Sequence, residues 1–239
     1  MYCATQRKKN RKSVFLSRQG SVSGAQLKVS VRAYMSAVNK FNCFLYLRTN
    51  ITIGAKKKEI IMKKVLILSG SPRKGGNSDL LCDEFMRGAK ESGNDVEKIR
   101  VAEKNIGYCR GCYYCTKSGG KCAIKDDMSE VLQKMIDADV IVLASPVYFY
   151  SVCAQLKAVI DRTVARWTEV KDKEFYYIAT CADEARTSTD TTVACFRGYA
   201  DCVEGAKEKA VILGTGVYEK GEIIGSQAMT DAYNAGLNV

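Results

Sequence analysis

Residues 65–78 read Val65-Leu66-Ile67-Leu68-Ser69-Gly70-Ser71-Pro72-Arg73-Lys74-Gly75-Gly76-Asn77-Ser78, and this stretch decides the fold. Four apolar residues form a short buried strand, and a polar loop with three glycines follows it. An apolar stripe at helical spacing then runs over residues 77–93 and ends at the stop signal Gly93. The stretch therefore predicts a strand, a tight loop and a helix, the repeating unit of a parallel α/β sheet.

The rest of the chain after residue 62 repeats this alternation of apolar runs and amphipathic segments. We expect strands at residues 65–68, 95–102, 140–144, 175–180 and 210–214, and helices at residues 77–93, 126–138, 154–165, 191–203 and 226–235. Short apolar runs separated by helices are typical of parallel strands that helices cover on both faces. The sequence therefore predicts an α/β fold with a doubly wound, five-stranded parallel sheet in three layers.

Residues 1–61 differ in composition from the rest. They hold 13 Lys and Arg and one acid, a net charge of +12, whereas residues 62–239 have a net charge of −1. They lack a helical or alternating period, a bilayer-spanning apolar run and a secretory signal pattern. We expect residues 1–61 to be a basic, disordered or non-native extension, and residues 62–239 to be the folded domain. A transit peptide, or a tail for nucleic acid or an anionic membrane, is the alternative.

Composition excludes several classes of chemistry. The 239 residues include 11 Cys and no His, so Ser-His-Asp and Cys-His catalysis and imidazole-dependent zinc sites are excluded. The basic excess lies in residues 1–61, so the folded domain is not expected to bind nucleic acid. The sequence shows no export signal, no membrane segment and no sign of a disulfide framework. We therefore expect the protein to be located in the cytoplasm.

The loop at residues 69–78 is suited to holding an anion. Its donors and cations are Ser69, Ser71, Arg73, Lys74, Asn77 and Ser78. The glycines let the backbone approach closely, and the start of the helix adds free N–H groups. The loop matches neither G-x-x-x-x-G-K-[ST] nor G-x-G-x-x-G, which disfavours a P-loop NTPase and a dinucleotide site. An ordinary turn with one helix-capping residue is the simpler alternative.

A second candidate loop follows the strand expected at residues 140–144. It reads Ser145-Pro146-Val147-Tyr148-Phe149-Tyr150-Ser151. Backbone amides of residues 147–150 can hydrogen-bond the polar edge of a flat heterocycle, and the aromatic side chains offer faces for packing. A strand end whose aromatics belong to the core is the alternative. Thr180-Cys181-Ala182 follows the strand expected at residues 175–180. It would form a third side of the same pocket, because the carboxyl ends of parallel strands share one edge of the sheet.

Both loops resemble motifs of a known family. The motifs are Leu68-Ser69-Gly70-Ser71-Pro72-Arg73 with Gly76-Asn77-Ser78, and Ala144 to Ser151 followed by Gln155-Leu156-Lys157 and Asp161-Arg162. They are similar to the flavodoxin-like NADPH-dependent FMN reductase family, which includes the iron-sulfur flavoproteins, over about residues 62–215. The resemblance implies a flavodoxin-like fold, with the FMN phosphate in the first loop and the isoalloxazine ring in the second. The residues expected to bind the cofactor are Ser69, Ser71, Arg73, Asn77, Ser78, Pro146, Val147, Tyr148, Phe149 and Cys181.

Four cysteines lie between the second expected strand and the helix at residues 126–138. They are Cys109, Cys112, Cys115 and Cys122, with the spacing C-x2-C-x2-C-x6-C. Two-residue gaps let successive sulfurs converge, and an all-thiolate set suits a [4Fe-4S] cluster or a zinc site. The spacing also resembles the compact cysteine motif of the iron-sulfur flavoproteins. Free thiols are the other alternative, because cluster-free relatives keep some cysteines in this loop.

These features predict an FMN-dependent NAD(P)H oxidoreductase, with NAD(P)H as substrate and an electron acceptor that the sequence does not identify. The cofactor carries the redox chemistry, so no side chain is assigned as acid or base. One alternative is an electron carrier that a ferredoxin-like partner reduces, and another is a zinc-held, non-catalytic binding module. The family resemblance also implies a homodimer or larger assembly, in which a neighbouring subunit helps to close the flavin site.

Overall fold

The computed structural model describes residues 62–239, so the expectations for residues 1–61 lie outside the described residues. The sheet of the described part has five parallel strands in the order β2-β1-β3-β5-β6. They are β1 (Lys64–Ser69), β2 (Asp95–Arg100), β3 (Val140–Tyr148), β5 (Glu174–Thr180) and β6 (Lys207–Gly214). This strand order is that of the flavodoxin-like doubly wound sheet, which confirms the predicted fold class.

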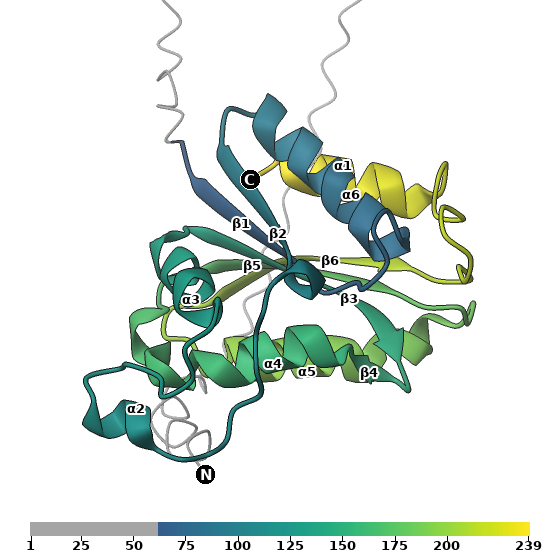
Figure 1. The fold of residues 1–239 in the computed structure, drawn as a ribbon. Helices are drawn as coiled ribbons and strands as arrows, with labels where there is room; N and C mark the ends of the chain where they lie inside the picture. The colour runs from purple at the N-terminus through teal and green to yellow at the C-terminus, as the bar shows by residue number, and fades with distance from the viewer. Residues whose placement is uncertain (1–61) are drawn as a thin grey trace, which may run out of the picture. The chain divides into compact units, whose positions relative to one another are not determined.

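Helices cover both faces of the sheet (Figure 1). One face carries α1 (Asn77–Glu91) and α6 (Gln227–Leu237), and the other carries α3 (Met128–Asp137), α4 (Ala154–Arg162) and α5 (Asp190–Ala200). Alternate residues of β1 point to opposite faces. Val65 and Ile67 pack in one core with α1 and α6, whereas Leu66 and Leu68 pack in the other. The three predicted layers are therefore present.

Short elements lie between the main ones. They are α2 (Tyr114–Lys117), β4 (Ser151–Val152) and the 3₁₀ helices η2 (Val101–Glu103), η3 (Thr163–Ala165), η4 (Trp167–Glu169) and η5 (Arg186–Thr189). The sequence patterns gave no sign of α2 or β4, and η3 replaces the last turn of the helix expected at residues 154–165. None of the helices in residues 62–239 is long and apolar enough to cross a membrane.

Strand β3 runs four residues beyond its predicted end. Val147 and Tyr148 pair antiparallel with β4, and Pro146 stands opposite Thr180 of β5. Pro146, which the sequence placed in the loop after the strand, therefore lies within the strand. The turn itself comes later, at Phe149 and Tyr150.

Helices α1 and α6 touch at two glycines. A Cβ on Gly88 would lie 2.2 Å from the carbonyl oxygen of Tyr233, and one on Gly236 would lie 2.1 Å from that of Phe85. The two backbones thus approach so closely that neither position has room for a side chain. This contact fixes α1 against α6, and the beginning of α1 follows directly on the predicted anion loop.

The Gly88→Ala variant is expected to unfold with a free energy lowered by about 1–3 kcal/mol, because its methyl group has no room. The matched control is Gly198→Ala in α5, where nothing lies within 4 Å of the added Cβ. That variant should gain about 0.5–1 kcal/mol from helix propensity. Denaturant unfolding of both variants measures the difference, and equal stabilities would contradict the close helix contact.

Candidate functional site

The first loop (residues 69–78) meets the second candidate loop at the carboxyl edge of the sheet. The second loop and the residues that flank it (residues 144–153) are called the hairpin loop below. The N–H of Gly70 donates to the carbonyl oxygen of Ala144 at 2.8 Å. The Cys153 thiol donates to the carbonyl oxygen of Gly70 at 3.0 Å, and the Cys153 N–H donates to Ser145 Oγ at 2.9 Å. The structure therefore brings the two predicted loops together and bonds one to the other.

This contact requires glycine at position 70. A Cβ on Gly70 would lie 2.8 Å from Cys153 Sγ and 2.9 Å from the carbonyl oxygen of Ala144. Neither neighbour is the free end of a flexible side chain, because the thiol is buried and the carbonyl belongs to β3. Any larger residue would push the two loops apart.

Helix α1 begins without a side-chain cap. Its N-cap is Gly76, which has no side chain, and the first helical bond is donated by the N–H of Leu80 to the carbonyl oxygen of Gly76. The hydroxyl of Ser78 is buried and makes no hydrogen bond within residues 62–239. The start of α1 thus offers free backbone N–H donors beside a buried hydroxyl without a partner. A bound anion would accept hydrogen bonds from these groups.

Ser71 and Arg73 shape the first loop and fasten it to a distant segment. The hydroxyl of buried Ser71 accepts a hydrogen bond from the N–H of Arg73 at 3.2 Å. The Arg73 guanidinium donates to the carbonyl oxygen of Tyr218 at 2.8 Å and lies 5.7 Å from the centre of that ring. Both residues stand beside the start of α1, and their role as cofactor ligands stays a prediction.

Asn77 holds the segment that follows β6. Its side-chain amide donates to the carbonyl oxygen of Glu219 at 2.9 Å, and its Oδ1 accepts from the N–H groups of Gly221 and Ile223 at 3.0 and 3.3 Å. These bonds occupy the Asn77 side chain, so its contribution to an anion site would come from its backbone N–H.

A residue that the sequence patterns did not reveal, Asp79, lies beneath the first loop. Its carboxylate accepts from Ser69 Oγ and from the N–H of Gly75, each at 2.8 Å. Arg100 and Lys98 of β2 form ion pairs with it at 2.5 and 3.2 Å. Burial works to raise the pKa of Asp79, but the hydrogen bonds from Gly75 and Ser69 and the charge of Lys98 outweigh it, and the pKa is lowered.

The hairpin loop has a strained backbone at its tip. Phe149 and Tyr150 have φ angles of 50° and 60°, in the left-handed region. Two-residue hairpin turns need such angles but usually take Asn or Gly there. Each larger residue costs about 1–2 kcal/mol in that region. Phe149 is nevertheless fully exposed, so packing within residues 62–239 does not offset the strain.

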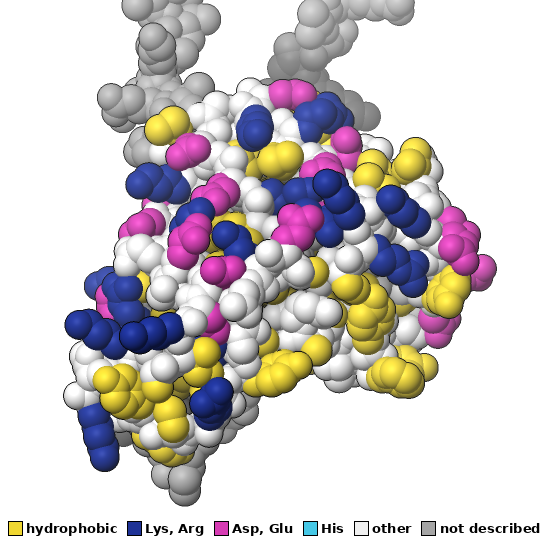
Figure 2. Space-filling model, viewed as in Figure 1, with side chains coloured by type: hydrophobic (Ala, Val, Ile, Leu, Met, Phe, Trp, Pro, Cys, Tyr) yellow, Lys and Arg dark blue, Asp and Glu magenta, His cyan; other side chains and the backbone are white. Residues whose placement is uncertain are grey.

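Hydrophobic side chains gather on the part of the surface where Figure 1 places the β3–β4 hairpin (Figure 2). Tyr148, Phe149 and Tyr150 are all exposed there. They are not core residues, which removes the alternative that their aromatic rings close the interior. A strained turn that presents aromatic rings to its surroundings is typical of a binding site.

Cys181 follows β5 at the same edge, as the topology predicted. It is buried, its thiol donates to the carbonyl oxygen of Asp183 at 3.2 Å, and its own carbonyl oxygen accepts from the N–H of Val217 at 2.9 Å. Burial raises the pKa of this thiol. Cys181 therefore joins the segments after β5 and β6, and its contact with a cofactor stays a prediction.

The four predicted metal ligands lie in one segment, residues 108–125, which we call the cysteine segment. Cys109 and Cys112 are exposed, Cys115 and Cys122 are half-buried, and all four are free thiols. No acidic residue occurs between Lys104 and Asp126. Four thiols without a competing carboxylate fit an iron–sulfur centre by chemistry. Within residues 62–239, however, no three His, Cys, Asp or Glu side chains are arranged to hold a metal ion, so the centre stays a prediction.

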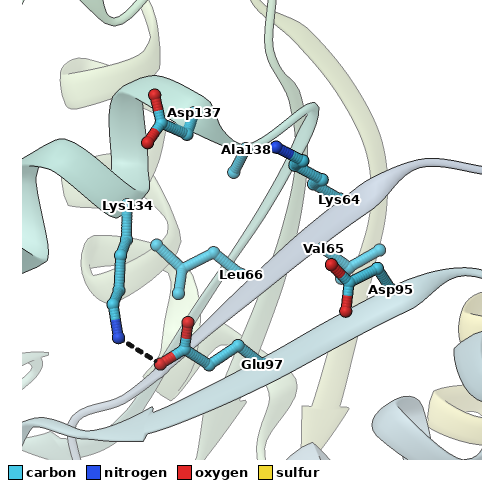
Figure 3. Close-up of a pocket in the computed structure, with 8 residues that line it drawn as sticks. All are labelled: Lys64, Val65, Leu66, Asp95, Glu97, Lys134, Asp137 and Ala138. Atoms are coloured by element: carbon cyan, nitrogen blue, oxygen red, sulfur yellow. Dashed lines mark hydrogen bonds and ion pairs between the residues drawn. The ribbon is translucent and has the colours of Figure 1, made fainter.

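A cavity of about 220 Å³ lies at the opposite edge of the sheet, where the strands begin (Figure 3). It is lined by the start of β1, by β2 and by the end of α3, and Lys134 pairs with Glu97 across it at 2.5 Å. None of the predicted site residues lines this cavity. This cavity is therefore not part of the predicted flavin site, which lies at the carboxyl edge, where the two loops meet.

Comparison with known proteins shows the family to which the chain is similar. The model of the NADPH-dependent FMN reductase family matches residues 63–221. An iron-sulfur flavoprotein of Methanocaldococcus jannaschii is 49% identical over 100 residues, which are 42% of this chain and 51% of that protein. One from Archaeoglobus fulgidus is 45% identical over 101 residues, 42% of this chain and 45% of that protein. The chain thus spans about half the length of these curated relatives.

Solved structures share the fold. The crystal structure of an azoreductase from Bacillus anthracis superimposes with a TM-score of 0.61 at 16% identity. The match covers 74% of this chain and 100% of that one. This likeness supports the arrangement of strands and helices described above.

The Asp79→Asn variant should lose about 2–3 kcal/mol of stability at neutral pH, because Lys98 and Arg100 lose the charge that they face. The folded pKa of Asp79 is lowered from 3.8, so its stabilisation is present above that value and is lost as the pH falls through the lowered pKa. Denaturant unfolding at several pH values should therefore show the variant and the wild type converging below about pH 4.

The matched control is Asp83→Asn, since Asp83 also pairs with Lys98 but its side chain is 42% exposed. The Asp83→Asn variant should lose less than about 1 kcal/mol of stability at neutral pH. A constant stability gap between Asp79→Asn and the wild type down to strongly acidic pH would show that the charge of Asp79 plays no part.

Proposed function

The chain belongs to the NADPH-dependent FMN reductase family, and on that premise we propose that it is an FMN-dependent NAD(P)H oxidoreductase of the flavin, quinone or small-acceptor type. One observation carries the proposal. The unpartnered hydroxyl of Ser78 lies at the uncapped start of α1, in a loop bonded through Gly70 to the hairpin loop. A phosphate and a flat ring at adjacent strand tips would use both features.

The first loop fits the phosphate of FMN. The backbone N–H groups at the start of α1 and the Ser78 hydroxyl would donate to its oxygens, and Arg73 and Lys74 add positive charge. Asp79 does not repel it, because Arg100 and Lys98 neutralise that carboxylate from below. The chain thus supplies hydrogen-bond donors in the loop and keeps the acid buried beneath it, Asp79, paired.

The hairpin loop fits the ring. Bound FMN would supply hydride acceptance from NAD(P)H and electron delivery to an acceptor. Backbone amides of residues 147–150 would hydrogen-bond the polar edge of the ring, while Tyr148 and Phe149 would pack against it and exclude water. With no His in the chain, no imidazole serves as acid or base, and the residues act by binding and orientation.

We further propose that Cys109, Cys112, Cys115 and Cys122 hold a [4Fe-4S] cluster that exchanges electrons with the flavin. The four free thiols support this, and so does the similarity to proteins named iron-sulfur flavoproteins. The proposal includes a homodimer or larger assembly in the cytoplasm. Pairing through the exposed hairpin tip would cover its aromatic side chains and help to offset the strain of the turn.

Purified protein offered excess FMN should bind it in equal molar amount, and NADPH added without oxygen should bleach the flavin absorbance. Ser78→Ala should weaken FMN binding by about tenfold, since it removes a hydrogen bond to a charged group. Ser92→Ala, at the other end of α1, is the control that should leave the affinity unchanged. Fluorescence titration measures both variants, and a wild type that cannot retain FMN would end the proposal.

A double variant, Phe149→Asn with Tyr150→Gly, should raise the free energy of unfolding by about 1–2 kcal/mol, because these residues accept the left-handed turn. It should also weaken FMN binding, because the aromatic contact with the ring is lost. Asp172→Gly is the control, since Asp172 also has a left-handed φ, 56°, but lies outside both loops. If the hairpin variant bound FMN as well as the control did, the tip would not belong to the site.

A further inference from the structure

A buried ion pair closes the base of the cysteine segment. Nη1 and Nη2 of Arg162, the last residue of α4, donate to the carboxylate of Asp126 at 2.8 and 2.9 Å. Nη1 also donates to the carbonyl oxygen of Gly107 at 2.7 Å, and the N–H of Gly107 donates to Asp126 at 2.8 Å. The side chains of Arg162 and Asp126 are only 2% and 4% exposed.

These contacts fix both ends of the cysteine segment. Gly107 comes two residues before Cys109, and Asp126 comes four residues after Cys122. Burial works to raise the pKa of Asp126, but the hydrogen bonds of Arg162 outweigh it, and the carboxylate stays charged. A buried ion pair is often no more stable than an apolar pair of similar volume, so its value lies in the positions that it sets.

One donor of the Arg162 guanidinium has no acceptor. Its Nε–H is buried and makes no hydrogen bond within residues 62–239. A buried donor without a partner costs about 1–3 kcal/mol, and native structures rarely keep one without a reason. The Arg162 Nε–H is therefore free to donate to a further acceptor.

Cys122 is the candidate for that acceptor, because it shares a cavity with Arg162. Cys122 and Arg162 line the same cavity, of about 770 Å³, between the cysteine segment, α3 and α4. The pKa of Arg162 is raised, chiefly by its hydrogen bonds to Asp126, and Cys122 adds to that effect. A neutral thiol accepts hydrogen bonds weakly, whereas a thiolate bound to a metal carries negative charge and accepts them well.

We propose that Arg162 is the positioning residue of the metal centre, with its Nη atoms holding the ends of the cysteine segment and its Nε–H donating to Cys122 Sγ when that sulfur binds the cluster. The inference rests on the proposed function, because it requires the cluster. A hydrogen bond to a ligand sulfur stabilises the added negative charge of the reduced cluster, so it raises the reduction potential.

The test compares Arg162→Lys, which keeps the charge but not the fork of donors, with Arg166→Lys. Arg166 lines the same cavity but pairs with Glu169 and Gln133. After anaerobic reconstitution with iron and sulfide, Arg162→Lys should hold FMN as the wild type does. The affinity of this variant for iron should fall about 10–100-fold, because a residue that orients a metal ligand is lost. The reduction potential of its cluster should become more negative. Arg166→Lys should match the wild type in all three measurements.

The outcomes separate this inference from the proposed function. A folded Arg162→Lys protein with wild-type iron content and potential would overturn the inference and leave the cluster in place. A wild type that binds FMN but neither iron nor sulfide would overturn the cluster and the inference together, and leave the flavin site standing.

A second measurement keeps Arg162 intact and does not depend on the folding of Arg162→Lys. Protein carrying isotope-labelled arginine Nε, with Arg110 and Arg166 replaced by lysine, is reconstituted and reduced. Pulsed electron paramagnetic resonance should then show magnetic coupling between a labelled nitrogen and the cluster. The absence of that coupling would overturn the inference.

Discussion

The close contact of Gly70 with the tip of β3 is the constraint on which the site depends. Because position 70 has no side chain, its N–H reaches Ala144 and its carbonyl oxygen reaches the Cys153 thiol. The first loop and the hairpin loop are thereby bonded to each other at adjacent strand tips. A single ligand with an anionic end and a flat aromatic end can then contact both loops, which is the shape of FMN.

Two of the six buried side-chain polar atoms that have no partner in residues 62–239 lie where the proposed cofactors would bind. The Ser78 hydroxyl lies at the start of α1, and the Arg162 Nε–H lies at the end of α4. Helix α4 runs from the flavin site to the proposed metal centre, since it starts just after Cys153 of the hairpin loop and ends at Arg162, beside the cysteine segment. Its nine residues span about 14 Å. One rigid element thus sets the position of both candidate sites.

The sequence predicted the ten main elements and the meeting of the two loops, because apolar periodicity and parallel topology determine both. It did not predict the extension of β3, because that pairing depends on a turn whose residues, Phe149 and Tyr150, are not turn formers. Asp79 was also missed. Its partners Lys98 and Arg100 stand two residues apart on one face of a strand, and that spacing was the available signal. The pair of Arg162 and Asp126 joins residues far apart in the chain, so only the fold reveals it.

Hydrogen exchange with and without FMN tests the central claim most directly, because it shows where along the chain the cofactor binds. The two bonded loops should gain protection together, in residues 70–80 and in residues 147–153. The opposite edge of the sheet, at residues 64–66 and 95–97, should exchange as before. Protection of one loop without the other, or protection confined to the opposite edge, would contradict the account.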